Sequence, residues 1–218
     1  VCLILALVVT LCSAFAVQAE EAGTVNLTEA HAYETATSLC FIEDTLYMLG
    51  AYGIYEYKNG TLATIIDLSD AYRYRFNSQR PTDETEAAAW DKIVGHLFSD
   101  GKTLYGLHPY TGQVFEIANG GLSEYAQVSE DLLYAAEEQF FREIKGVAYA
   151  GEKLILLLGT DTYDEYEKTE IALVDLKAQT HQISQIKNVQ SIAVGAEGKL
   201  NAYVENEGMA AFWQYDVS

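Results

Sequence analysis

The sequence is poor in proline, cysteine and basic residues. Its 218 residues include two prolines and three cysteines, and 13 Lys and Arg against 32 Asp and Glu give a net charge of -19. A surface this acidic repels nucleic-acid phosphates and anionic lipid, so neither is an expected partner. Half of the residues are hydrophobic, which is enough for a packed core. At roughly 100–200 residues per domain, the length suits one domain or little more.

Local catalytic motifs are also lacking. The sequence contains no Gly-x-Ser-x-Gly elbow, no His-Glu-x-x-His, no phosphate-binding glycine loop and no Cys or His cluster with zinc spacing. Dispersed carboxylates would escape such a search, so the enzyme question stays open, leaning towards no catalysis. We expect no cofactor, with calcium as the one candidate ion.

The first 19 residues differ from the rest of the chain. Residues 1–17 are uncharged and apolar, and Gln18-Ala19 precedes the acidic pair Glu20-Glu21. This pattern predicts a secretory signal peptide over 1–19, whose start is truncated because the first residue is not Met. A membrane anchor is the alternative, since about 17 apolar residues is the low end for a span. We expect residues 20–218 to be secreted or to lie in the cell envelope or periplasm, without membrane insertion after signal removal.

Cleavage there would leave one cysteine in the mature chain. Cys40 lies between Leu39 and Phe41 in a strand-like run. No internal disulfide is then possible, and we predict that Cys40 is a buried, unreactive thiol.

Four segments repeat one plan of strands separated by short turns. An apolar first strand, a turn with Asp, Glu or Gly, and an alternating second strand recur in each. A third strand carries an acidic residue among apolar ones, and a fourth follows in the first three units. The first strands are 36–42, 93–98, 145–150 and 189–194; the second are 45–49, 103–107, 154–158 and 200–204; the third are 54–57, 114–117, 173–176 and 214–217; the fourth are 61–67, 122–128 and 180–186.

Four antiparallel strands every ~45–50 residues are typical of propeller blades. On these segments the chain resembles secreted β-propellers of the broad group with NHL, quinoprotein-like and kelch-like repeats, without the marks of one subfamily. The resemblance implies an all-β fold over 20–218, with four-stranded antiparallel blades and short helical insertions between them. A β-sandwich or β-solenoid is the alternative.

The fourth unit stops after its third strand. One interpretation is a four-bladed ring closed by a strand at 24–27, and the other is part of a larger ring. We expect the second, so that residues 20–218 are a partial propeller.

The long connections are expected on one face. They are 70–91 and 129–143 between blades and 159–168 between the second and third strands of the third unit. Both kinds of connection emerge on the same side of a propeller, where repeat proteins usually bind ligands. An acidic cap and an apolar stripe predict a helix from Ser129 towards Ile144, and a second helix is expected within 81–93.

Candidate ligand-binding residues lie in these connections. Arginine offers a fork for carboxylate or phosphate, and aromatic rings offer faces for stacking. A turn adds an imidazole and a phenol on the same face, and one tryptophan lies in the second predicted helix. The candidates are Tyr72, Arg73, Tyr74, Arg75, Arg80, Trp90, His108 and Tyr110.

The acidic run at 161–167 is the candidate ion site. Asp161, Asp164 and Glu165 offer oxygen ligands for calcium, although the spacing departs from an EF-hand loop. A solvated hairpin tip is the alternative interpretation.

These observations favour an exported, non-catalytic recognition propeller. It would bind a carbohydrate, peptide or protein through the long-loop face, and its 16 tyrosines suit such contacts. The alternatives are an exported glycan-active hydrolase or lyase and a structural module of a larger surface protein.

Overall fold

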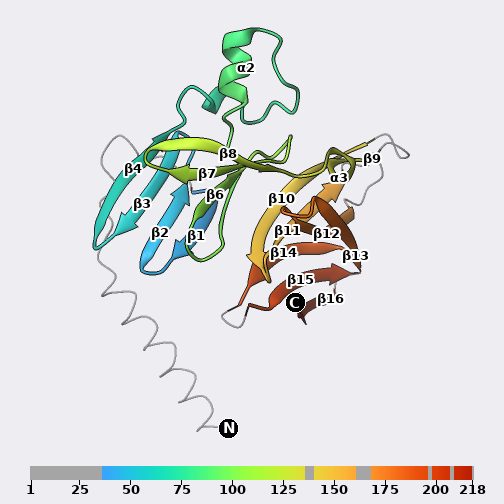
Figure 1. The fold of residues 1–218 in the computed structure, drawn as a ribbon. Helices are drawn as coiled ribbons and strands as arrows, with labels where there is room; N and C mark the ends of the chain where they lie inside the picture. Colours follow the sequence, from blue (N-terminus) through green and yellow to red (C-terminus); the bar gives the residue numbers. More distant parts are fainter. Residues whose placement is uncertain (1–35, 136–139, 161–167, 196–197, 207–208, 218) are drawn as a thin grey trace.

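The computed structural model of the chain describes residues 36–135, 140–160, 168–195, 198–206 and 209–217 (Figure 1). They form four antiparallel sheets that follow one another along the chain. The first contains β1 (Ser38–Ile42), β2 (Thr45–Leu49), β3 (Gly53–Lys58) and β4 (Thr61–Asp67); the second contains β5 (His96–Ser99), β6 (Leu104–Leu107), β7 (Gln113–Ala118) and β8 (Gly121–Gln127). The third contains β9 (Tyr134–Ala135), β10 (Phe140–Ala150), β11 (Lys153–Thr160), β12 (Lys168–Asp175) and β13 (Thr180–Lys187); the fourth contains β14 (Val189–Val194), β15 (Leu200–Asn206) and β16 (Met209–Tyr215).

The sheets are arranged as propeller blades. Their first long strands are neighbours, with β1 against β5, β5 against β10 and β10 against β14. A cavity of about 950 Å³ is lined by residues from all four of these strands, which places it at the propeller axis. The predicted all-β propeller is therefore confirmed, with a two-residue β9 added to the third sheet and three described strands in the fourth.

Short turns join the strands where the sequence predicted them. Both residues of each Asn-Gly pair have positive φ: 50° at Asn59 and 77° at Gly60 in the first blade, and 51° at Asn119 and 74° at Gly120 in the second. Two consecutive positive φ values define the type I′ hairpin turn, whose twist matches that of the flanking strands. The Asn-Gly pairs thus set the register between the third and fourth strands of the first two blades.

The core lies between neighbouring blades. Ile54 of the first sheet and Leu97 and Phe115 of the second belong to one buried cluster. Val114 and Leu156 belong to a cluster that joins the second sheet to the third, and a further cluster joins the third to the fourth. The second and third sheets are packed against a neighbouring sheet on each face, and the first and fourth sheets on one, so the blades hold one another in place.

Of the two predicted helices, one is present, and the other is absent over most of the described part of its predicted range. Helix α2 (Glu84–Trp90) begins after Asp83, whose carboxylate accepts hydrogen bonds from the amides of Thr85 and Glu86. By contrast, the helix expected from Ser129 to Ile144 is limited to α3 (Glu130–Leu133), and Ser129 makes no side-chain cap.

The cause of this correction is strand pairing. β10 begins at Phe140 rather than at Lys145, and Ile144 lies opposite Leu158 of β11. Ile144 is buried by the second and third sheets together, and this tertiary packing overrides the helical spacing of the apolar residues. The signal peptide at 1–19 and the closing strand at 24–27 lie outside the described residues. In the described part of the chain, no helix is long and apolar enough to cross a membrane.

Candidate functional site

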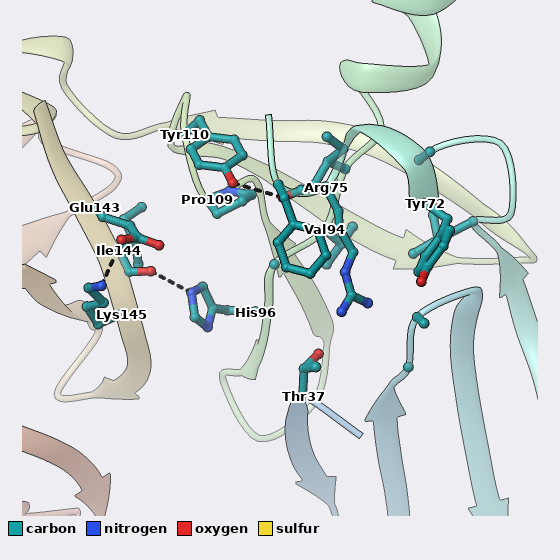
Figure 2. A pocket seen from close by; sticks show the side chains of 17 residues that line it. Thr37, Tyr72, Arg75, Val94, His96, Pro109, Tyr110, Glu143, Ile144 and Lys145 are labelled. Carbon is teal, nitrogen blue, oxygen red and sulfur yellow. Dashed lines mark hydrogen bonds and ion pairs between the residues drawn. The ribbon is translucent and has the colours of Figure 1, made fainter. Parts of the chain in front are cut away.

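A cavity of about 330 Å³ opens on the face that carries the long connections (Figure 2). Its wall includes Thr37 directly before β1, His96 at the start of β5 and Lys145 within β10. Gly50 and Tyr110 come from connections between second and third strands. The segment between the first two blades supplies the remaining side, so two kinds of connection meet at this cavity.

The 3₁₀ helix η2 (Tyr72–Tyr74) carries Arg75 into the cavity wall. Ala71, directly before it, is 6% exposed and packs with Trp90 and Ile93, so the segment is anchored from below. The guanidinium carbon of Arg75 lies 5.2 Å from the ring centre of Tyr72 and 4.4 Å from that of Phe76. No carboxylate of the described residues pairs with it. Figure 2 shows this guanidinium in the space that Thr37 and Tyr72 also line.

Tyr110 holds the backbone of this segment in place. Its hydroxyl donates a hydrogen bond of 2.8 Å to the carbonyl of Arg75, 35 residues away (Figure 2). Its ring is stacked with Trp90 at a centroid distance of 6.4 Å. Burial, followed by the nearby Glu143 charge, raises the pKa of Tyr110, which keeps this hydroxyl a donor at neutral pH. Tyr110 is thus a positioning residue for Arg75.

Three wall residues were not predicted from the sequence. Glu143 and Lys145 form an ion pair of 2.7 Å, and the Nε2 atom of His96 lies 2.9 Å from the carbonyl of Ile144 (Figure 2). Burial lowers the pKa of His96, so its ring is neutral at pH 7 with Nε2–H as the donor. Of these three, only Lys145 begins a first strand as predicted from the sequence (145–150), so the strand pattern offers no common signal for His96 and Glu143.

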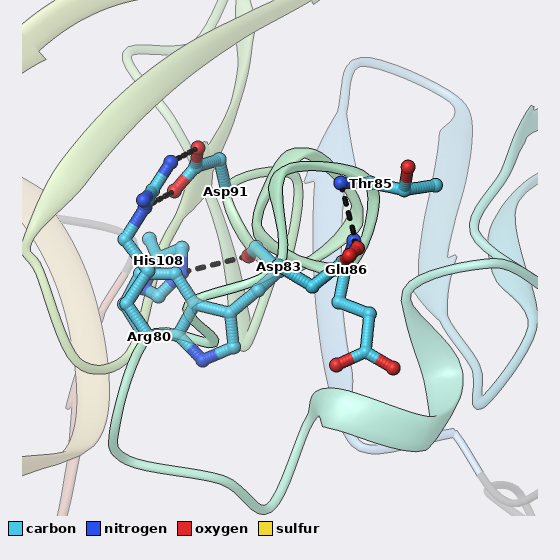
Figure 3. A network of polar contacts seen from close by, with 7 residues as sticks. Arg80, Asp83, Thr85, Glu86, Asp91 and His108 are labelled. Carbon is cyan, nitrogen blue, oxygen red and sulfur yellow. Dashed lines mark hydrogen bonds and ion pairs between the residues drawn. The ribbon is translucent and has the colours of Figure 1, made fainter.

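Arg73, Tyr74 and Arg80 lie outside the cavity wall. Arg73 stacks on Tyr74, 5.7 Å from its ring centre. Arg80 forms a two-bond ion pair with Asp91, with distances of 2.7 and 2.6 Å (Figure 3). Hydrogen bonding from Arg80 lowers the pKa of the Asp91 carboxyl, so this pair stays charged over the physiological range.

Trp90 and His108 lie beneath the site rather than at its surface. Their side chains are 3% and 1% exposed, which leaves them no direct access to a ligand in this structure. The Nε2 atom of His108 lies 3.1 Å from the Trp90 carbonyl, and its Nδ1 accepts from the amides of Tyr110 and Thr111. Burial lowers the pKa of His108 to about 4. These contacts fix the turn that presents Tyr110.

The candidate calcium ligands Asp161, Asp164 and Glu165 lie outside the described residues. Over the described ranges, no group of three or more His, Cys, Asp or Glu side chains is arranged to hold a metal ion.

No protein-family profile matches the chain, and no curated protein matches it significantly. The solved structures that match it include two of the extracellular domain of BT4673 from B. thetaiotaomicron, described once as a hybrid two-component system and once as a one-component system. The TM-scores are 0.39 and 0.40 at 11% identity. The matches cover 83% and 82% of this chain, which spans about a fifth (22%) of the length of the matched chains.

Proposed function

We propose that this chain is an exported, non-catalytic recognition propeller that binds its ligand in the long-loop cavity. The observation that carries the proposal is Arg75, a half-buried guanidinium in a cavity wall, without an ion-pair partner among the described residues. Such a group is costly to leave unpaired in the folded protein and is satisfied by a ligand. Carbohydrates, peptides and proteins all present groups that it recognises.

The exported location rests on the sequence. The apolar run at 1–17 with the small residue Ala19 before two acids is the pattern of a secretory signal peptide. The net charge of -19 favours a soluble surface that avoids nucleic acid and anionic lipid.

A thermal-shift screen against glycans and peptides tests the proposal. A ligand present at 100 times its Kd stabilises the folded chain by about 2.7 kcal/mol, which raises the Tm by about 5–10 °C for this size. Thr37→Trp fills the cavity from an exposed position, and Thr61→Trp at the exposed start of β4 is the matched control. We expect the shift to disappear in the first variant and to persist in the second.

Two results would contradict the proposal. A ligand that shifts the Thr37→Trp variant as strongly as the unmodified chain binds elsewhere. Product release from a glycan in the same panel would replace the proposal with the alternative of an exported hydrolase or lyase.

Calcium binding at Asp161, Asp164 and Glu165 is a separate proposal. A Tm that rises with calcium, and no longer rises after Asp161→Asn plus Asp164→Asn, would support it. An identical Tm with and without calcium would oppose it.

A further inference from the structure

Among the described residues, the cavity wall carries one uncompensated positive charge. The Lys145 ammonium is neutralised by the Glu143 carboxylate at 2.7 Å. The His96 ring is neutral at pH 7 because burial opposes its protonation. Arg75 is left as the only cation in the wall without an anionic partner, within the residues that the structure describes. The cavity is therefore matched to a ligand with one negative charge at this point.

We propose, building on the proposed function, that the ligand is an acidic saccharide whose uronate carboxylate pairs with Arg75. The planar guanidinium fork matches a carboxylate with two parallel hydrogen bonds. A phosphate dianion would leave about one negative charge uncompensated within a chain of net charge -19, which disfavours phosphorylated ligands. A single carboxylate balances the single guanidinium.

The aromatic rings beside Arg75 favour a sugar ring as the body of the ligand. Phe76 is 79% exposed and Tyr72 is 37% exposed, and both line the cavity. Flat, partly exposed rings offer contact area to the C–H face of a pyranose. The same two rings stack against the guanidinium, so the carboxylate partner and the stacking surface are held next to each other.

The backbone of the wall favours a saccharide over a peptide C-terminus. Peptide carboxylates are commonly captured by free backbone amides arranged as a nest. Here the amides of Gly50, Tyr72 and Gly95 already donate to the carbonyls of other residues. The guanidinium is therefore the group that meets the carboxylate.

The guanidinium is also preorganised. The Tyr110 hydroxyl fixes the carbonyl of Arg75, and stacking on Tyr72 and Phe76 restricts its side chain before any ligand arrives. A restrained side chain loses less freedom on binding, so more of the interaction contributes to affinity.

Titration calorimetry with galacturonic acid trimers and their methyl esters tests the inference. Esterification removes the charge and keeps the sugar rings. We expect Arg75→Gln to weaken binding of the acid at least about tenfold, and esterification to weaken binding to the unmodified chain to a similar extent. The two losses should not add, because both remove the same pair. Arg73→Gln is the matched control, two residues earlier and outside the cavity wall, and should leave the affinity unchanged.

The outcomes separate this inference from the proposed function. Equal affinity for acid and ester, with binding abolished by Thr37→Trp, would refute the pairing of a ligand carboxylate with Arg75. The cavity would remain the binding site. Binding of peptides with a free C-terminus, without binding of any uronate, would refute the inference that the ligand is a saccharide. Affinity for the acid that survives Thr37→Trp would overturn the proposed function itself. Matching Tm values for the three Arg and Thr variants establish that each is folded.

Discussion

His108 makes the stability of the fold depend on pH in a way that can be measured. Its side chain is 1% exposed, with Nδ1 as the acceptor for the amides of Tyr110 and Thr111 and Nε2 beside the Trp90 carbonyl. An acceptor at Nδ1 requires the neutral ring. Protonation would bury a charge and turn this acceptor into a donor facing two other donors.

The magnitude follows from the two pKa values. Burial lowers the pKa of His108 from 6.5 to about 4 in the folded chain. The unfolded chain therefore takes up a proton as the pH falls through 6.5, whereas the folded chain takes it up only near pH 4. The contribution of the neutral His108 to the free energy of unfolding is fully present above pH 6.5 and is lost as the pH falls towards 4. Its full size is on the order of 3 kcal/mol. About 2 kcal/mol of this is lost between pH 7.5 and pH 5.

Urea unfolding of the unmodified chain and of His108→Gln, at pH 7.5 and pH 5, isolates this contribution. Glutamine does not titrate, so the variant should lose about 2 kcal/mol less on acidification, a difference of roughly 1 M urea in midpoint. His96, whose pKa burial also lowers, is present in both proteins and cancels. If both proteins lose the same free energy between the two pH values, the neutral buried imidazole is refuted.

Three further predictions concern packing, reactivity and the sheet edge. Gly112 has φ of +72°, and a Cβ there would lie 2.8 Å from the Val128 Cβ, so Gly112→Ala should cost roughly 2–4 kcal/mol in urea unfolding. Gly60→Ala, with φ of +77° and open space, should cost about 1 kcal/mol, and equal costs would contradict the packing argument. Burial raises the pKa of Cys40 to about 11, so mass mapping should show its alkylation at pH 8 to be about 100-fold slower in the folded chain than in urea; comparable rates would mean an accessible thiolate. Phe212 is 84% exposed on β16, the last strand of its sheet among the described residues, so we expect concentration-dependent self-association at this edge in sedimentation velocity, and we expect Phe212→Lys to reduce it. The same profile for both proteins would show that this edge is not a contact.

Much of the strand plan could be predicted because its signals are local. β2, β4 and β14 have the predicted bounds, and the Asn59-Gly60 and Asn119-Gly120 turns are specified by residues that tolerate positive φ. The acidic residue among apolar ones located β3 and β7, but in the fourth unit the third strand is Met209–Tyr215 rather than the predicted 214–217. The helix expected up to Ile144 failed because the third sheet contributes contacts that a single segment does not contain.

The candidate site could be predicted only as far as the face on which it lies. The connection rule placed the long loops together, and Tyr72, Arg75 and Tyr110 do line the cavity there. The rule did not distinguish Arg75 from Arg73, two residues away, because that difference depends on how η2 is rotated against the core. It also did not reveal that Arg80 meets Asp91, 11 residues later in the chain.

The sequence by itself therefore determined the all-β propeller, its turns and its strongly acidic character, because hydrophobic alternation, turn residues and charge are properties of short segments. The tertiary structure alone decided that His108 and Trp90 support the loops from below. It also decided that Arg75 faces the cavity without an ion-pair partner among the described residues, while Lys145 is neutralised by Glu143. Burial and ion pairing depend on which distant segments meet, and the blades bring those segments together only in the folded chain.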